Sequence, residues 1–173
     1  MPPTTVLVTF YSRGGTTEKL AHAAAVGAVQ ARALIRLRRV ADADPQATLA
    51  RFPECREDLR RMHKEYVAPR EADVEAAGAL IVGSKDDVDA MSPEWSPYLD
   101  LLRRMHAEGR LAGKAAAAIG SGPAYDSFSA VIRQLGLATV PADPMGAAEA
   151  DAVGGAMSLG REVVEVARAL EKE

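Results

Sequence analysis

A turn rich in glycine and hydroxyl side chains follows the first apolar segment of the chain. Val6–Phe10 is apolar or β-branched throughout, as in a parallel strand that is buried on both faces. Residues 18–30 then have the spacing of a helix. Such a helix directs its free N–H groups and the positive end of its dipole into the turn. The turn therefore predicts a phosphate site. Its residues are Ser12, Arg13, Gly14, Gly15, Thr16 and Thr17.

The spacing of this turn differs from the common nucleotide-binding motifs. No Gly-Lys-Ser/Thr follows it and no Gly-x-Gly-x-x-Gly occurs in it, so the P-loop and the dinucleotide fingerprint are absent. A phosphate here would be held by N–H and O–H groups, with Arg13 as optional help. These donors suit a terminal monophosphate better than a triphosphate with magnesium. The alternative is an ordinary turn without a ligand.

Two more apolar segments are followed by loops of polar or small residues. Ala79–Gly83 and Ala115–Ile119 have the continuous apolar character of buried parallel strands. Loops that follow neighbouring parallel strands meet at one edge of the sheet, so we expect these two loops to face the same ligand as the first turn. The candidate contact residues in them are Ser84, Lys85, Asp86, Asp87, Val88, Ser121, Gly122 and Tyr125.

The order of the segments predicts an α/β fold in a single domain over residues 1–173. Short apolar strands alternate with helices five times, which indicates a doubly wound five-stranded parallel sheet of order 2-1-3-4-5. Ala33–Leu37 with its alternating arginines predicts a second strand at the sheet edge, and Leu137–Val140 a fifth strand. A charged helical excursion occupies about 45–70. We expect further helices to begin near Ser92, as N-cap, and after about Gly155.

Composition narrows the class of protein. The chain has 173 residues, of which 48% are apolar and 26% charged, which is typical of a globular domain. The net charge of -3 argues against nucleic acid as a partner. A lone Cys55 allows no internal disulfide and fits a reducing compartment. The absence of a signal-like start and of a long apolar run predicts a cytoplasmic location without a membrane span.

At this point the sequence resembles a known family. It is similar to the flavodoxin-like proteins and, among them, to NAD(P)H:quinone oxidoreductases of the tryptophan-repressor-binding-protein type. The resemblance covers most of residues 5–140. The matching motifs are Tyr11-Ser12-x-x-Gly15-x-Thr17-Glu18-Lys19-Leu20-Ala21, Gly78-Ala79-Leu80-Ile81-Val82-Gly83-Ser84, Met91-Ser92-Pro93-Glu94, Tyr98-Leu99-Asp100 and Gly109-x-Leu111-x-Gly113-Lys114.

The resemblance implies bound FMN, an NAD(P)H electron donor, a quinone acceptor, and a homodimer or homotetramer. FMN carries the hydride chemistry in such proteins, so the sequence assigns no catalytic side chain. The sequence departs from the family where the flavin ring would lie. The family's Pro-Thr-Arg-Phe-Gly-Asn is replaced by residues 85–90, and its Ser-Thr-Gly-Thr-Gln-His-Gly-Gly by residues 120–127, with Tyr125 at the histidine. His106 stands where the family has a tryptophan.

The rewritten loops leave three interpretations open. Carboxylates at Asp86, Asp87 and Asp89 that faced the ring would oppose the negative charge of reduced FMN. They would have no such effect if they pointed to solvent, and they could instead bind a divalent cation, although we assign no metal site. The alternatives to an FMN oxidoreductase are accordingly a flavodoxin-like binding module that has lost flavin, and a non-enzymatic FMN electron carrier.

Overall fold

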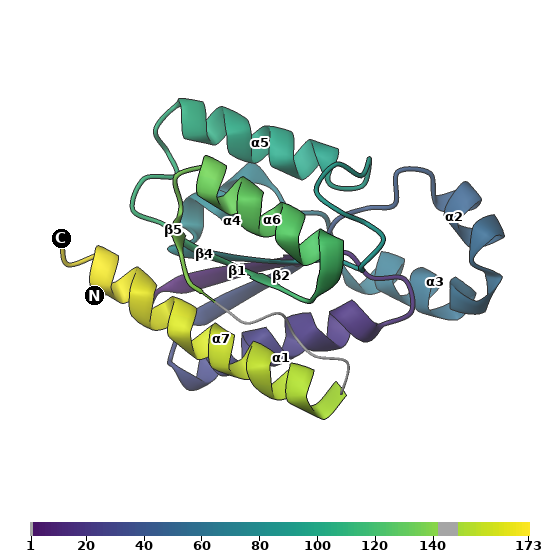
Figure 1. Cartoon of the computed structure of the whole chain (residues 1–173), viewed down its shortest axis with the longest axis horizontal. Coiled ribbons are helices and arrows are strands. Elements are labelled where there is room, and N and C mark those ends of the chain that lie inside the picture. The colour runs from purple at the N-terminus through teal and green to yellow at the C-terminus, as the bar shows by residue number, and fades with distance from the viewer. Residues whose placement is uncertain (1, 142–148) are drawn as a thin grey trace.

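The computed structural model describes residues 2–141 and 149–173. It confirms the predicted parallel sheet, whose strands lie in the order β2-β1-β3-β4-β5 (Figure 1). The strands are β1 (Thr5–Phe10), β2 (Leu34–Arg39), β3 (Ala79–Gly83), β4 (Ala115–Ile119) and β5 (Ala138–Thr139). The third and fourth strands have the predicted bounds, because each is a continuous apolar run buried along its whole length.

Helices cover both faces of the sheet (Figure 1). One face packs against α1 and α7, and the other against α5 and α6. The helical elements are α1 (Thr16–Gln30), α2 (Pro45–Arg51), the 3-10 turn η1 (Pro53–Cys55), α3 (Arg56–Glu65), α4 (Glu71–Ala76), α5 (Ser96–Ala107), α6 (Gly122–Gln134) and α7 (Glu149–Leu170). None of the helices in these described stretches combines the length and apolar character needed to cross a bilayer.

Two glycines let the backbones of α1 and α7 touch. A Cβ added at Gly27 would lie 2.0 Å from the carbonyl oxygen of Met157, and one at Gly160 would lie 2.0 Å from that of Ala24. Any side chain there would have to push the helices apart. This close contact fixes the position of α1, whose first turn follows the loop after β1.

The second strand confirms its predicted edge position but runs over Leu34–Arg39 instead of 33–37. The backbone N–H of Leu34 bonds to the carbonyl of Thr4, and the strand pairs with β1 through Arg39. Two of its arginines, Arg36 and Arg38, bind the carboxylate of Asp73 at 3.1 and 3.0 Å. Burial opposes ionisation of Asp73, but these arginines outweigh it and lower the pKa of that carboxyl.

The charged excursion forms α2, η1 and α3 and lies at the carboxyl ends of the strands (Figure 1). Leu59 and Met62 are fully buried on its inner side. The N–H of Arg39 bonds to the carbonyl of Val67, and the ring of Tyr66 packs edge-on against Phe10 at 5.0 Å between centroids. The excursion therefore closes over the end of the first two strands.

Other predicted boundaries were wrong as well. The helix expected at Ser92 begins at Ser96, because Ser92 belongs to turns in which Trp95 and Ser96 bond back to residues 92 and 93. The fifth strand is Ala138–Thr139, since only two of its residues pair with β4. The last helix is already formed at Glu149, so glycines at 154 and 155 do not delay it; residues 142–148 of the expected loop lie outside the described residues. The loop expected over 120–125 turns into α6 at Gly122.

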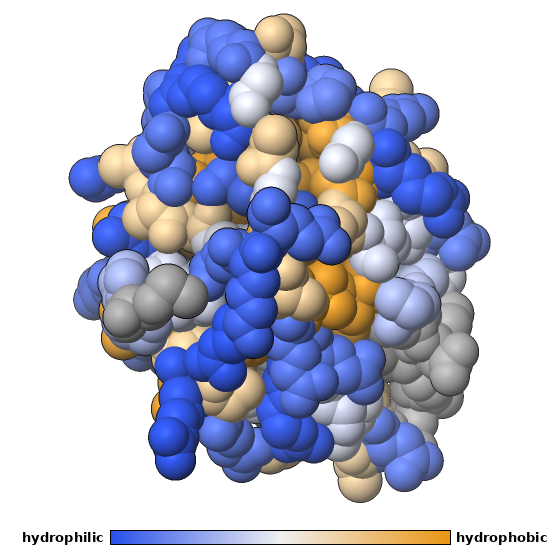
Figure 2. Space-filling view, turned by 90° about the vertical axis from the view of Figure 1, so that its left-hand side faces the viewer, coloured by the Kyte–Doolittle hydropathy of each residue, from blue (hydrophilic) through white to orange (hydrophobic). Residues whose placement is uncertain are grey.

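The end of the sheet opposite the excursion carries both hydrophobic and hydrophilic surface. Figure 2 looks onto this side, where hydrophobic areas are separated by a larger hydrophilic surface. His106 lies there, at the last turn of α5, and a Cβ added at Gly136 would be 3.4 Å from its ring. His106, which stands at a tryptophan position of the family, therefore lies outside the rim, because the last turn of α5 places it at the opposite end of the sheet from the three loops.

Candidate functional site

The loops after β1, β3 and β4 meet at one edge of the sheet, as the sequence predicted. The N–H of Tyr11 bonds to the carbonyl of Gly83 at 2.9 Å, which joins the first two loops. A Cβ added at Gly120 would lie 3.7 Å from the carbonyl oxygen of Ser84, which places the third loop against the second. The hydroxyl of Ser127 also accepts a bond from the N–H of Ala90 at 3.0 Å. The three loops thus form one continuous rim.

The loop after β1 leaves the N-terminus of α1 open. Gly15 is the N-cap residue with φ 90°, a conformation that favours glycine, and no side chain caps the helix. The hydroxyl of Ser12 is used inside the loop, where it accepts the N–H of Gly15 at 3.1 Å. The first N–H groups of α1 are therefore left to bind an anion. Thr16 is exposed beside them and Thr17 is buried.

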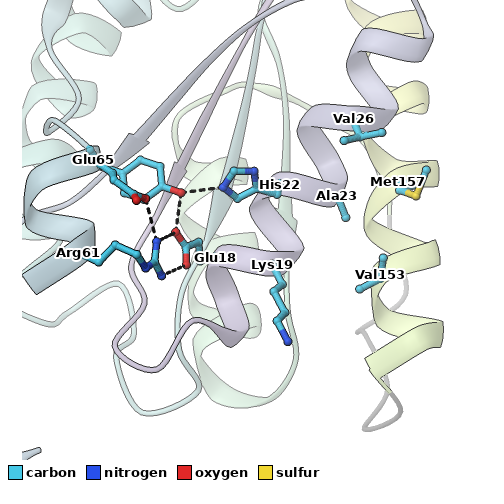
Figure 3. Close-up of a pocket in the computed structure, with 10 residues that line it drawn as sticks. Glu18, Lys19, His22, Ala23, Val26, Arg61, Glu65, Val153 and Met157 are labelled. Carbon is cyan, nitrogen blue, oxygen red and sulfur yellow. Dashed lines mark hydrogen bonds and ion pairs between the residues drawn. The ribbon is translucent and has the colours of Figure 1, made fainter. Parts of the chain in front are cut away.

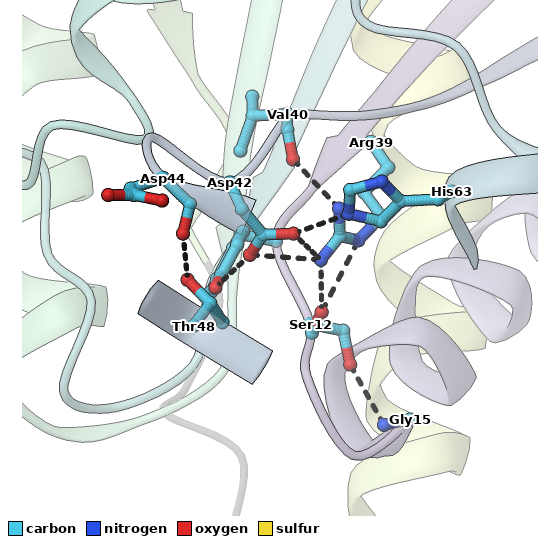
Figure 4. A network of polar contacts seen from close by, with 9 residues as sticks. Ser12, Gly15, Arg39, Val40, Asp42, Asp44, Thr48 and His63 are labelled. Atoms are coloured by element: carbon cyan, nitrogen blue, oxygen red, sulfur yellow. Dashed lines mark hydrogen bonds and ion pairs between the residues drawn. The ribbon is translucent and has the colours of Figure 1, made fainter. Parts of the chain in front are cut away.

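A buried network holds this loop from behind (Figure 4). Arg39 donates to the carbonyl oxygen of Ser12 at 2.8 and 3.3 Å, and it pairs with Asp42 at 3.3 Å. Asp42 also accepts the hydroxyl of Tyr11 at 2.6 Å and contacts His63 Nε2 at 2.7 Å. Arg39 and Asp42 are 4% and 5% exposed. The backbone of the loop is thus fixed by an arginine at the end of β2.

Asp42 is ionised in this network. Burial opposes the charge, but the bond from Tyr11, the charge of Arg39 and the bond with His63 together lower the pKa of the Asp42 carboxyl below its ordinary value. The same burial and hydrogen bond raise the pKa of the Tyr11 hydroxyl, so this hydroxyl stays protonated and donates. Arg39, Asp42 and His63 were not predicted to support the loop, because they form no spaced motif with Tyr11.

Arg13 links the first loop to the second. Its guanidinium pairs with Asp87 at 2.6 Å and lies over the ring of Phe52, with 3.9 Å from Cζ to the ring centroid. Arg13 is 5% exposed, and its Nε is buried without a hydrogen-bond partner among the described residues. Burial tends to lower the pKa of Arg13, but Asp87 outweighs burial and raises it. Arg13 therefore balances one of the three acidic charges of the second loop.

Glu18 places a negative charge in the first turn of α1, and α3 neutralises it. Arg61 donates to both carboxylate oxygens at 2.6 and 2.9 Å, and the hydroxyl of Tyr66 donates at 2.6 Å (Figure 3). The bonds from Arg61 lower the pKa of Glu18 despite its burial. The hydroxyl of Tyr66 also lies 2.7 Å from His22 Nε2. The open end of α1 thus keeps its attraction for an anion although a carboxylate lies beside it.

The loop after β3 is held by its own residues. The hydroxyl of Ser84 donates to the carbonyl of Val88 at 2.5 Å and accepts the indole N–H of Trp95 at 3.0 Å. Trp95 is fully buried and stacks edge-on with Phe128 at 4.6 Å, so it is a core residue at the start of α5. These bonds turn the loop back on itself immediately after the strand.

The acidic side chains of this loop do not converge. Asp86 is exposed together with Lys85, whereas Asp87 pairs with Arg13. Asp89 is turned toward the start of α5, where it accepts the N–H of Met91 at 2.9 Å. Among the described residues, no group of three or more His, Cys, Asp or Glu side chains could hold a metal ion. The alternative of a cation site in this loop therefore has no support from the geometry.

The third candidate segment is the first turn of α6. Gly120 and Gly122 have φ values of 118° and 71°, and Ser121 is the N-cap residue, without a capping bond from its side chain. Tyr125 is half-buried against the cluster that contains Trp95. The structure thus provides a second open helix terminus close to the first two loops.

Two exposed histidines contact residues around the first loop. His63 contacts Asp42, and His22 contacts Tyr66. Cys55 lies beside the first loop, where a Cβ added at Gly14 would be 3.7 Å from its sulfur. The positions of His63 and Cys55 follow from the excursion, which folds back on the loop.

The chain matches no protein-family model. It is 32% identical over 115 residues to an NAD(P)H dehydrogenase (quinone) from Archaeoglobus fulgidus, covering 65% of this chain and 58% of that protein. It is 34% identical over 124 residues to a protein of the same name from Gluconacetobacter diazotrophicus, covering 68% and 56%. The chain spans little more than half the length of these curated relatives.

Solved structures resemble the whole chain. A short-chain flavodoxin associated with a bacterial microcompartment matches with a TM-score of 0.64 and 17% identity, over 95% of this chain and 99% of that one. A WrbA-like flavodoxin from Agrobacterium tumefaciens matches with a TM-score of 0.60 and 18% identity, over 96% and 98%. The resemblance predicted from the sequence is thereby confirmed at the level of the fold, which is flavodoxin-like.

Proposed function

We propose that this flavodoxin-like chain binds FMN at the rim formed by its three loops and uses it to carry electrons from NAD(P)H to a quinone. The observation that carries the proposal is the uncapped N-terminus of α1 behind Gly15, at the edge where all three loops meet. Curated relatives named NAD(P)H dehydrogenase (quinone) support the activity, and flavodoxin neighbours support the cofactor.

The first loop fits the phosphate of FMN. A doubly charged phosphate needs N–H donors and a positive surrounding, and α1 offers free N–H groups and its dipole. Thr16 and Thr17 carry hydroxyl groups beside them. The two nearby carboxylates, Glu18 and Asp42, are paired with Arg61 and Arg39. A phosphate at Ser12–Thr17 would therefore meet no unbalanced negative charge.

The loop after β3 and the start of α6 depart from the family's sequence pattern. We nevertheless propose that the flavin ring lies against Ser84–Val88, Ser121, Gly122 and Tyr125. Two of the three carboxylates in the loop after β3 have partners that support this assignment: Arg13 balances Asp87, and Asp89 accepts the N–H of Met91. Of the three carboxylates, only that of Asp86 remains exposed and without an ion pair among the described residues. The acidic loop is thus compatible with a reduced flavin ring.

When bound, FMN would supply the hydride chemistry that connects a nicotinamide donor to a quinone acceptor. The side chains of this chain would bind and orient the cofactor. Arg39 would hold the carbonyl of Ser12, so that the free N–H groups at the start of α1 stay directed at the phosphate. Arg13 would hold the loop after β3 against the loop after β1 through its ion pair with Asp87. The short bonds of Ser84 would hold the second loop in one conformation. No acidic or basic side chain is needed in this account.

The activity is tested by mixing FMN-loaded protein with NADH or NADPH and a soluble benzoquinone. We expect NAD(P)H oxidation that depends on both FMN and the quinone. Protein that binds FMN but does not oxidise NAD(P)H would instead indicate the electron-carrier alternative. Protein that does not bind FMN at all would leave the flavin-free binding module, for which Lys85 and the three aspartates of the loop after β3 are the favouring feature.

We place the protein in the cytoplasm, as a single flavodoxin-like domain without nucleic acid partners, in agreement with its net charge of -3. A homodimer or homotetramer is supported by exposed apolar side chains at Val26, Val29, Leu34 and Ile35. Light scattering coupled to size-exclusion chromatography measures the assembly directly, and a monomer at micromolar concentration would contradict it.

A further inference from the structure

A cavity lies between α2 and α3, and none of the residues that line it belongs to the rim of the three loops. Its volume is about 390 Å³, which is within the range of sites for small organic ligands. It is formed entirely by the excursion and by the segment that follows β2. The residues that line it are Asp42, Pro45, Leu49, Leu59, Arg60, His63 and Lys64.

One wall of the cavity is basic. Arg60, His63 and Lys64 occupy positions i, i+3 and i+4 of α3, so their side chains leave the helix on the same face. Within residues 2–141 and 149–173, neither Arg60 nor Lys64 has a hydrogen-bond or ion-pair partner. The neighbouring Arg61 differs, because it pairs with Glu18, Asp58 and Glu65. The cavity therefore keeps two positive charges that the folded chain does not balance.

Three of the remaining lining residues are apolar. Pro45 and Leu49 come from α2, and Leu59 from the inner side of α3. Leu49 is half-buried, whereas Leu59 is only 1% exposed and belongs to the packed interior. A ligand with an apolar body would cover Leu49 and place its polar end toward Arg60 and Lys64.

The acidic group at the base of the cavity does not repel an anion. Asp42 is ionised, but its oxygens are taken by Tyr11, Arg39 and His63, and Arg39 supplies the compensating charge. His63 lines the cavity together with Asp42, which it contacts at 2.7 Å, and its side chain is 39% exposed. The charge that a ligand meets is then set by Arg60 and Lys64.

From this arrangement we propose that the cavity between α2 and α3 binds a small amphipathic organic anion, with an apolar body against Leu49 and an anionic group between Arg60 and Lys64. The site is separate from the proposed FMN site and does not depend on it. A ligand there would contact His63, whose partner Asp42 orients the arginine that holds Ser12.

Three probes separate the contributions of charge and apolar surface. 2-Naphthoate carries both features, 2-naphthamide has the same apolar body without the charge, and acetate has the charge without the body. Titration calorimetry on the whole protein should show binding of 2-naphthoate that is about tenfold tighter than that of either other probe, because removing the charge or the apolar contact each weakens the interaction. Added salt should weaken naphthoate binding more than amide binding.

Variants then locate the bound probe. The double substitution Arg60→Gln with Lys64→Gln should weaken naphthoate binding about tenfold, while Arg133→Gln with Lys172→Gln, which removes two exposed charges outside the excursion, should leave it unchanged. Leu49→Trp should fill the cavity and abolish binding. Each variant is first checked for an unchanged melting temperature, which its exposed or half-buried position favours.

Equal affinity for naphthoate and naphthamide, or unchanged binding in the Arg60/Lys64 variant, would overturn the charged site. Unchanged binding in Leu49→Trp would overturn its location and place the probe elsewhere, for example among the strand-end loops. Because neither result involves flavin, the outcome is distinct from success or failure of the proposed FMN activity.

Discussion

The loop after β1 and the loop after β3 are held in different ways, although both end at the same rim. The first is fixed from outside: Arg39 holds Ser12, and Phe52 packs on Arg13 from the excursion. The second is fixed from within and by its own helix, through Ser84, Val88 and Trp95. The geometry of the first loop therefore depends on residues distant in sequence, and that of the second mainly on local ones.

This difference has a consequence for where substitutions act. Changes in the excursion or in β2 should disturb the proposed phosphate end while leaving the proposed ring end in place. Changes at Ser84 should do the reverse. The two ends are joined directly through Arg13 and Asp87, in addition to the sheet beneath them.

Arg39→Met should have the largest effect. It leaves the buried carboxylate of Asp42 without its arginine and releases the carbonyl of Ser12. We expect a loss of about 3–5 kcal/mol in the free energy of unfolding, as for breaking a buried ion pair from one side. Urea denaturation measures this loss, and FMN titration of the protein that remains folded should show weaker binding.

Arg36→Met on the same strand is the matched control for that substitution. Asp73 keeps its bonds from Arg38, and Arg36 is 39% exposed, so we expect a loss of about 1 kcal/mol or less. Equal losses for the two variants would show that Arg39 has no special part in holding the loop.

Ser84→Ala comes next. It removes the acceptor of the buried Trp95 indole N–H and the bond to the carbonyl of Val88, and such unsatisfied groups cost about 1–3 kcal/mol. If the second loop is held locally, amide exchange should speed up in residues 84–90 and stay unchanged in residues 12–17. Equal acceleration in both loops would contradict the separation between them.

Gly15→Ala should cost about 1–2 kcal/mol, because alanine is strained at a φ of 90°. Gly113→Ala supplies the control, since Gly113 has a φ of 78° but precedes β4, at the opposite edge of the sheet. The two variants should lose similar stability, measured by thermal unfolding. Only Gly15→Ala should weaken FMN binding; a similar weakening in both would remove the first loop as the phosphate site.

The smallest effect is a change in pH dependence. The pKa of Asp42 is lowered in the folded state, so its contribution is present above the unfolded pKa of about 3.9 and is lost as pH falls through the lower folded value. The free energy of unfolding of the natural protein should therefore decrease below about pH 4. Asp42→Asn should show a shallower decrease in denaturation curves over this range, whereas parallel curves would contradict the assignment.

The sequence was sufficient for the sheet and for the place of the rim. β3 and β4 are continuous apolar runs, and the order of five strands follows from their alternation with helices. The network behind Ser12 could not be predicted in the same way, because Tyr11, Arg39, Asp42 and His63 belong to separate segments whose contacts are set by packing. Arg39 ends a strand with two other arginines, and nothing in the sequence distinguishes the buried one.

The charges of the second loop illustrate the same limit. Three aspartates within four residues left open a loop that repels the flavin, a solvated loop or a cation site. In the structure Asp87 pairs with Arg13, Asp89 accepts the N–H of Met91, and Asp86 is exposed. The difference arises from Arg13, which lies 74 positions from Asp87 in the chain. The helix start at Ser96 was missed for a related reason, since serine and proline at 92 and 93 form turns here and not a cap.

Titration of flavin-free protein with FMN, followed by flavin fluorescence and the visible spectrum, tests the central claim most directly. We expect binding at micromolar concentration or tighter, with a shifted flavin band, because the N-terminus of α1 is open and its neighbouring carboxylates are paired. No binding at tens of micromolar FMN would contradict the account and show that the rim of three loops serves another ligand.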